Sequence, residues 1–233
     1  LRGKIASMIF QDPMSSLNPV VRVGDQIAEA IIAHGGEPAQ ARRRAVDLLA
    51  SVGIPDAAAR ARSYPHQMSG GMRQRVMIAM AIANDPILLI ADEPTTALDV
   101  TIQAQVLDLL AELKQRRRLA MVFISHSLPV VAEIADRVVV MYAGEIVEEA
   151  PGAALFERPR HPYSAALIAC SPSDDGQAPR PIEGVVPQPN DLPPGCAFAP
   201  RCAFRIAACD MARPPLASVG EGRRSRCIRW SDL

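Results

Sequence analysis

Two adjacent carboxylic acids, Asp92 and Glu93, stand directly after the apolar run at residues 87–91 and before Pro94. A short, uniformly apolar run is typical of a parallel strand that is covered on both faces. Ligands of α/β sheets bind at the carboxyl ends of such strands, so one carboxylate could hold Mg²⁺ there while the other accepts a proton from an attacking water. The alternative for the pair alone is a solvated acidic turn.

A second candidate site is Ser69-Gly70-Gly71, at the expected start of an apolar helix that runs to about Asn84. The glycines leave the backbone open to an anion, and the free N–H groups and positive end of a helix favour phosphate. An ordinary Ser N-cap before a glycine pair is the alternative. The continuation at residues 72–75, Met-Arg-Gln-Arg, favours the phosphate site.

Three further polar residues could complete such a site. His126 follows a predicted buried strand at 121–124 and could hydrogen-bond a terminal phosphate, with a purely structural histidine as the alternative. Gln11 follows a predicted strand at 5–10 and could orient a water or a metal, or could simply be solvated. Asp99 most simply N-caps the helix that follows it.

Strand and helix signals alternate along the first part of the chain. Helical spacing of apolar residues predicts helices at 24–33, 39–52, 101–117 and 128–135. Short apolar runs predict strands at 5–10, 87–91, 121–124, 138–141 and 145–147, with a turn at Gly144. This alternation predicts an α/β layered domain over residues 1–150. Prolines then become frequent and periodicity fades, so we expect an irregular appended region at 151–233.

Composition restricts the class of protein. The 233 residues are 49% hydrophobic and carry no formal net charge, so we expect no nucleic-acid partner. No apolar run approaches the roughly 20 residues of a membrane-spanning helix, and we expect a soluble chain. The sequence does not begin with Met, and we expect residue 1 to be a point of truncation.

Four of the five cysteines fall within one Pro-rich segment: Cys196, Cys202, Cys209 and Cys227. Disulfides are not expected in a reducing cytoplasm, and four thiolates are enough to close a tetrahedral metal site. Zinc ribbons generally carry Cys-x-x-Cys pairs, and none is present in this segment. The spacing therefore favours a [4Fe–4S] cluster, with zinc second and four free thiols as the alternative.

The order and spacing of these motifs resemble those of ATP-binding-cassette (ABC) ATPases over residues 1 to about 150. The corresponding segments are the Q-loop at Gln11, the signature at 68–72, Walker B at 88–93, the D-loop at 96–99 and the switch histidine His126. Residues 10–19, 72–81 and 160–164 resemble the oligopeptide/dipeptide importer branch, which includes some nickel importers. The tails of that branch often carry a similar cysteine set.

The resemblance implies a P-loop NTPase-type fold with a helical subdomain at about 20–85, and a dimer that holds ATP and Mg²⁺ between its subunits. Glu93 would be the general base, Asp92 would hold Mg²⁺, and His126 would contact the γ-phosphate. Gln11 would link this site to the permease. The remaining implied nucleotide-binding residues, those of the signature and the D-loop, are Ser69, Gly70, Gly71 and Asp99.

The implied function is ATP-driven import of di- or oligopeptides from the cytoplasmic face of the membrane. The implied partners are a second ATPase subunit, identical or paralogous, a membrane permease and, indirectly, a substrate-binding protein. One alternative is a soluble ABC ATPase of DNA repair or translation. Another is a pseudo-ATPase that supplies only its signature to a partner.

Three departures from the family pattern stand out. Met68 replaces the usual Leu, and Ser127 stands where an acidic residue commonly follows the histidine. The phosphate-binding loop Gly-x-x-x-x-Gly-Lys-Ser/Thr is absent from the sequence. The family places that loop upstream of the Q-loop, so we expect an N-terminal truncation and no hydrolysis by this fragment alone.

Overall fold

The computed structural model describes residues 2–96, 98–171, 181–220 and 222–233. Its contacts divide the chain into two compact units, Leu1–His126 and Ser127–Leu233. The first unit holds a parallel sheet of β1 (Ala6–Ile9), β2 (Leu88–Asp92) and β3 (Ala120–Ile124), in the order β1-β2-β3. Ile9 pairs with Ala91, and Asp92 pairs with Ile124. The carboxyl ends of all three strands therefore meet at one edge, with β2 in the centre.

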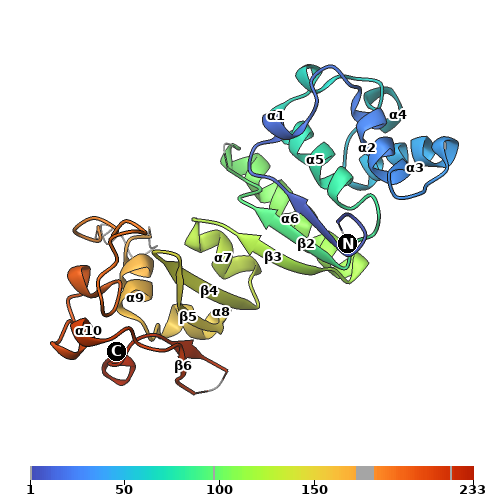
Figure 1. Ribbon diagram of the computed structural model, residues 1–233. Helices are drawn as coiled ribbons and strands as arrows, with labels where there is room; N and C mark the ends of the chain where they lie inside the picture. Colours follow the sequence, from blue (N-terminus) through green and yellow to red (C-terminus); the bar gives the residue numbers. More distant parts are fainter. Residues whose placement is uncertain (1, 97, 172–180, 221) are drawn as a thin grey trace. The chain divides into compact units, whose positions relative to one another are not determined.

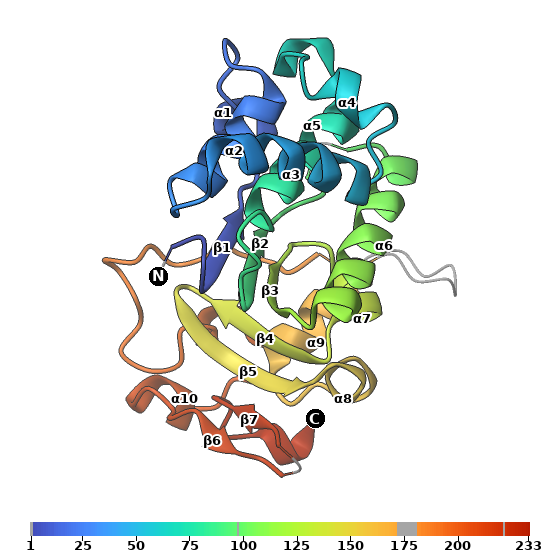
Figure 2. The ribbon, with the colours of Figure 1, turned by 90° about the vertical axis from the view of Figure 1, so that its right-hand side faces the viewer.

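Helices make up the rest of the first unit, and Figures 1 and 2 show α2 to α5 gathered beside the strands. Their bounds are α1 (Pro13–Ser16), α2 (Val23–Ile32), α3 (Pro38–Ser51), α4 (Ala57–Arg60), α5 (Gly70–Ala81) and α6 (Val100–Arg117), with a 3₁₀ turn at Pro65–Gln67. The predicted helices at 24–33, 39–52 and 101–117 are confirmed. Helix α5 ends before the predicted Asn84, because Asp85 takes a left-handed backbone with φ 48° and Pro86 follows it.

One apolar core joins these helices to the sheet. Its fully buried members include residues of β1, β2, α2, α3, α5 and α6, such as Ile9, Leu89, Ile27, Leu49, Ile78 and Val106. Strand β3 differs from the prediction of a buried strand, since Val122 and Ile124 are 47% and 45% exposed. Burial alternates along this strand because its two faces meet different surroundings, and uniform apolarity does not report that difference.

The second unit is built on an antiparallel sheet in the order β4-β5-β7-β6. Its strands are β4 (Arg137–Tyr142), β5 (Glu145–Pro151), β6 (Ala217–Ser218) and β7 (Arg224–Ser225). Its helices are α7 (Leu128–Ile134), α8 (Gly152–Glu157), α9 (Pro162–Ala169) and α10 (Ala208–Met211), with 3₁₀ turns at Ala199–Arg201 and Trp230–Asp232. The predicted turn between β4 and β5 is confirmed, with Gly144 at φ 82°.

The unit boundary lies at His126/Ser127, earlier than the predicted boundary near residue 150. The reason is strand pairing: β5 pairs with both β4 and β7, so the hairpin at 137–151 belongs with the cysteine-containing segment. That segment also has more structure than the predicted irregular tail, since Ala197 and Phe198 pack in a core with Val138 and Leu155.

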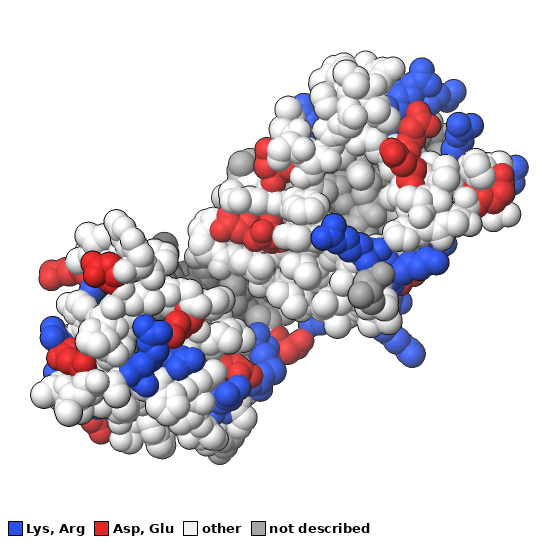
Figure 3. Space-filling view, viewed as in Figure 1, with Lys and Arg blue, Asp and Glu red and all other residues white. Residues whose placement is uncertain are grey.

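Two surface properties complete the description. Among the described helices, none combines the length and the apolar composition that a membrane crossing needs. On the face shown in Figure 3, acidic and basic side chains are interspersed over both units, in keeping with a formal net charge of zero.

Candidate functional site

The polar residues predicted from the sequence converge at the carboxyl edge of the first sheet. Gln11 lies two residues after β1, Glu93 directly after β2, and His126 two residues after β3. Because β2 is the central strand, the Glu93 carboxylate lies between the other two side chains. Gln11 Nε2 donates to Glu93 Oε2 at 2.7 Å, and His126 Nδ1 lies 3.0 Å from Glu93 Oε1.

The backbone around Glu93 fixes the direction of its side chain. Glu93 has a left-handed backbone with φ 46°, and its N–H donates to the Ile124 carbonyl of β3 at 2.9 Å. A tight turn follows, in which the Thr96 N–H donates to the Glu93 carbonyl at 3.1 Å. The Thr96 hydroxyl also donates to Glu93 Oε2, at 2.9 Å. Within the described part of the chain, the carboxylate therefore has three side-chain partners.

These partners set the charge state of Glu93. They lower the pKa of the Glu93 carboxyl, chiefly through the hydrogen bond with His126 and next through that from Thr96. Glu93 is thus an ionised carboxylate at neutral pH, which is the form that accepts a proton or faces a cation. Because a carboxylate only accepts hydrogen bonds, His126 must carry its hydrogen on Nδ1 in this arrangement.

Asp92 and the helix α5 occupy the remaining predicted positions. Asp92 is the last residue of β2 and is half-buried next to Glu93. Ser69 N-caps α5, with its hydroxyl accepting from the Met72 N–H at 3.3 Å, so the predicted cap is confirmed. Ser69 and Gly70 are exposed at this helix start. Their backbone is open to an anion, as the phosphate-site prediction requires.

The glycine pair also packs against the segment that begins α6. A Cβ on Gly71 would lie 2.6 Å from Ile102 Cγ2, so glycine is needed there for close packing as well. Asp99 N-caps α6 by accepting from the Ile102 N–H at 2.9 Å, as predicted. Ala97, within the predicted D-loop, lies outside the described residues. The structure thus forms two groups: Gln11–Glu93–His126 at the sheet edge, and the signature start beside residues 98–102.

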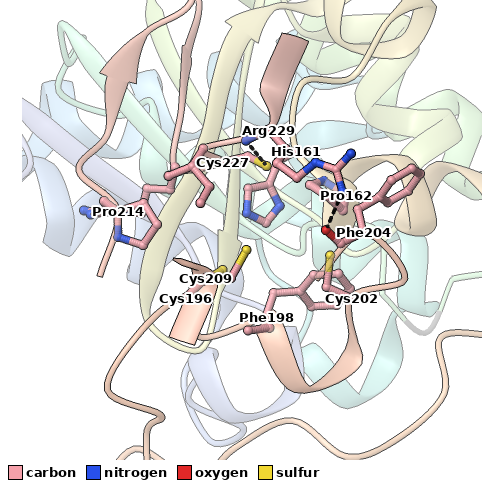
Figure 4. Close-up of a pocket in the computed structure, with 13 residues that line it drawn as sticks. His161, Pro162, Cys196, Phe198, Cys202, Phe204, Cys209, Pro214, Cys227 and Arg229 are labelled. Atoms are coloured by element: carbon pink, nitrogen blue, oxygen red, sulfur yellow. Dashed lines mark hydrogen bonds between the residues drawn. The ribbon is translucent and has the colours of Figure 1, made fainter. Parts of the chain in front are cut away.

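The four clustered cysteines line one pocket in the second unit, together with His161 and Phe198 (Figure 4). Burial is the main cause that raises the pKa of the thiols of Cys196, Cys202 and Cys227, and it takes Cys227 to about 11. Backbone N–H groups point at the same three sulfurs. The amides of Phe198 and Ala199 face Cys196, that of Phe204 faces Cys202, and that of Arg229 lies 3.3 Å from Cys227 Sγ.

The predicted metal site at these cysteines is not confirmed. Over the described ranges of the chain, no three residues among His, Cys, Asp and Glu are arranged to hold a metal ion. All four thiols are free. The four cysteines share the lining of one pocket, and their closure around an ion stays a prediction.

Comparison with known proteins decides the family. The family described as ABC transporter matches residues 1–96, and the one described as Oligopeptide/dipeptide transporter, C-terminal region, matches residues 147–209. The Escherichia coli dipeptide transport ATP-binding protein DppD is 54% identical over 97% of this chain and 70% of its own length. A Brucella ovis protein, named as a candidate peptide import ATP-binding protein, is 54% identical over 100% and 72%. The chain belongs to the ABC transporter ATPases.

Solved structures agree with this membership. The ATP-binding cassette MJ0796, solved as a dimer in a post-hydrolysis state with ADP and Pi, superposes with a TM-score of 0.56 at 28% identity, over 64% of this chain and 63% of that one. The protein cbiO1 of Clostridium perfringens, part of the ABC transporter complex cbiONQ, gives a TM-score of 0.59 at 25% identity, over 66% of this chain and 60% of that one. The predicted family, α/β fold and ATPase class are therefore confirmed.

Membership of this family also indicates the general ligands and partner proteins of the chain. ATP and Mg²⁺ are the ligands of the family, and the ATPase subunits work as dimers with membrane permeases. The match of the C-terminal region to an oligopeptide/dipeptide transporter family overturns the alternative of a DNA-repair or translation ATPase.

The contact that could not be predicted from the sequence is the hydrogen bond from Thr96 to Glu93, because a threonine in a polar turn carries no signal of where its hydroxyl points.

Proposed function

We propose that this chain is the ATP-hydrolysing subunit of an importer of di- or oligopeptides, associated with the cytoplasmic face of the membrane. The observation that carries the ATPase role is the ionised Glu93 carboxylate, held at the edge of the sheet between Gln11 and His126. The peptide substrate is supported by the relatives, which are named for peptide or dipeptide transport. A substrate-binding protein outside the membrane would then deliver the peptide to the permease.

The donor set at this edge fits the ligands of the family. Mg²⁺ prefers oxygen ligands and keeps several waters, and Asp92 offers a half-buried carboxylate beside Glu93. When bound, Mg²⁺ neutralises charge on the phosphates. Glu93 accepts the proton of the attacking water, a step for which its ionised form is ready. His126, with its side chain 71% exposed, is free to swing toward a terminal phosphate, and Gln11 reports the occupancy of the site to the permease.

The signature serves the partner subunit in this proposal. Helix α5 has 12 residues, and its N-terminus presents exposed backbone N–H groups at Gly70. A helix end of this length carries a partial positive charge that favours phosphate. Ser69 and Gly71 would complete the partner's nucleotide site, with the short D-loop segment at 98–99 beside them. The alternative of a chain that contributes only this signature remains an outcome of the test below.

The test is Glu93→Gln in the intact subunit assembled with its permease. Loss of a positioned base should lower ATP turnover by about 10²–10⁴-fold while nucleotide still binds. Glu157→Gln, an exposed residue of α8, is the matched control and should leave turnover unchanged. Wild-type turnover by the Glu93 variant would refute the assignment of the base and leave a chain that contributes only its signature to the partner's site. Turnover without uptake of labelled dipeptide or oligopeptide by the reconstituted complex would refute the substrate.

We further propose that Cys196, Cys202, Cys209 and Cys227 hold an iron–sulfur cluster. Support comes from the backbone amides that face three of the sulfurs, since hydrogen bonds to the sulfurs are among the features by which proteins tune the reduction potential of such clusters. A single zinc ion needs four sulfurs at about 2.3 Å from one centre. The segment carries no Cys-x-x-Cys pair of the kind that zinc ribbons generally have, which favours the cluster over zinc.

The test of the cluster is anaerobic purification of the intact subunit, followed by analysis of iron, acid-labile sulfide and zinc. The proposal predicts iron and sulfide in equal amounts, a visible absorbance band, and loss of both in Cys202→Ser. Cys170→Ser, outside the pocket, is the control and should retain both. Zinc in place of iron would refute the cluster, and the absence of any bound metal would leave four free thiols.

A further inference from the structure

Among the described residues, the hydroxyl of Thr96 is the one partner of the Glu93 side chain that lies close to it in sequence. It lies three residues along the chain and donates to Glu93 Oε2 at 2.9 Å. The other two partners come from distant strands, since Gln11 and His126 are separated from Glu93 by 82 and 33 positions. The same turn that brings the Thr96 hydroxyl to the carboxylate is closed by the Thr96 N–H to the Glu93 carbonyl, at 3.1 Å.

The three partners differ in what else they must do. In the proposed function, His126 turns to a terminal phosphate and Gln11 communicates with the permease. Either partner can therefore leave the Glu93 carboxylate during the reaction. The proposed function asks no such movement of Thr96, and its backbone is tied to that of Glu93. When the site is loaded, its hydroxyl is the donor that can still hold the carboxylate.

We propose that Thr96 is a positioning residue, whose hydroxyl holds the Glu93 carboxylate in the direction from which it accepts the proton of water. This inference rests on the proposed role of Glu93 as general base. It adds a second role for the segment after β2, because Thr96 lies between the base and the D-loop residues Leu98 and Asp99. Leu98 in turn lies beside the signature glycine Gly70, so movement of the signature start has a short path to the base.

The hydrogen-bond geometry explains why one hydroxyl can matter. Glu93 Oε2 accepts from both Gln11 and Thr96, whereas Oε1 faces only His126 among these partners. If Gln11 moves away, Thr96 is the remaining donor of these two to Glu93 Oε2. Without the hydroxyl, the carboxylate could rotate about its side-chain bonds, and a displacement of about 1 Å from the productive position can cost on the order of 100-fold in rate.

The experiment compares Thr96→Val, which keeps the shape and removes the hydroxyl, with Thr96→Ser, which keeps the hydroxyl. Both are measured in the intact subunit assembled with its permease, for kcat and KM of ATP hydrolysis and for thermal unfolding. We expect Thr96→Val to lower kcat by about 10- to 100-fold with KM unchanged, and Thr96→Ser to retain most of the wild-type kcat. Glu157→Gln, the exposed residue of α8, is again the control and should leave kcat unchanged.

The outcomes separate this inference from the proposed function. Wild-type kcat in Thr96→Val, together with an inactive Glu93→Gln, would refute the positioning role and leave the base assignment intact. An active Glu93→Gln would refute both. If Thr96→Val melts far below the wild type, the Thr96→Ser variant decides. When Thr96→Ser folds normally but loses as much kcat as Thr96→Val, a role for the hydroxyl is refuted.

Discussion

The strongest prediction concerns Glu148, a fully buried carboxylate on β5. Its Oε1 accepts from the Arg160 N–H at 2.7 Å and from Arg223 Nη2 at 3.3 Å, and Arg223 is itself only 8% exposed. Truncating one member of a buried ion pair leaves the other charge without compensation. We therefore expect Glu148→Met to destabilise the second unit by about 3–5 kcal/mol.

The double variant with Arg223→Met tests the origin of that cost. A buried ion pair that is replaced by apolar side chains of similar volume is often close to neutral. The double variant should therefore be more stable than the sum of the two single changes predicts, by at least about 1 kcal/mol. Part of the loss will persist, because the Arg160 N–H keeps no carboxylate partner in either background.

Urea unfolding, monitored by tryptophan fluorescence, measures the loss of stability in the second unit itself. The chain has a single tryptophan, Trp230, and the Arg160 guanidinium lies 5.4 Å from its ring centroid. Fluorescence thus reports on the second unit. A loss below about 1 kcal/mol in Glu148→Met, or strictly additive single changes, would refute the reasoning from a buried pair.

Three further predictions concern a buried histidine, a close glycine contact and a helix cap. Burial lowers the pKa of His161 from 6.5 to about 4, so the folded state binds a proton at this histidine less readily than the unfolded chain does. The free energy of unfolding should therefore fall by about 2 kcal/mol between pH 7 and pH 5, and urea unfolding should show no such difference in His161→Asn. Gly71→Ala should destabilise the first unit by about 1–3 kcal/mol despite the better helix propensity of alanine. In an Ile102→Ala background the same change should cost clearly less, and an equal cost in thermal unfolding would contradict the overlap as the cause. Asp99→Ala should cost about 1 kcal/mol through loss of the α6 cap, whereas Asp99→Asn or Ser should cost less, and equal melting of all three would contradict the capping role.

Local features of this fold could be predicted from the sequence, because their causes are local. Ser69 and Asp99 cap helices through amides three residues away, and the turn at Gly144 needs the left-handed backbone that glycine adopts freely. The parallel strands were also predicted, and with them the edge at which Gln11 and Glu93 meet.

Features that depend on distant partners could not be predicted. The hairpin at 137–151 reads like a continuation of the first unit, and only its pairing with β7, more than 70 residues later, assigns it to the second. The exposure of Val122 depends on what covers each face of the sheet, and apolarity alone does not encode it. The Thr96 hydroxyl needs the left-handed backbone at Glu93 to reach the carboxylate, and a glutamate before proline gives no sign of that conformation.

The Glu148 network also bears on the thiol pocket, through the short strand β7. Arg223 precedes β7, and the β7 residue Ser225 donates its hydroxyl to the Arg160 carbonyl at 2.7 Å and accepts from the Cys227 N–H at 3.2 Å. The buried pair therefore holds the segment that carries Cys227 into the pocket. If the four cysteines bind a cluster, Glu148→Met should lower iron content together with stability, whereas an equally destabilising change in the first unit, such as Leu49→Ala, should lower stability alone. Full iron occupancy in a destabilised Glu148→Met would show that Cys227 reaches the pocket without this support.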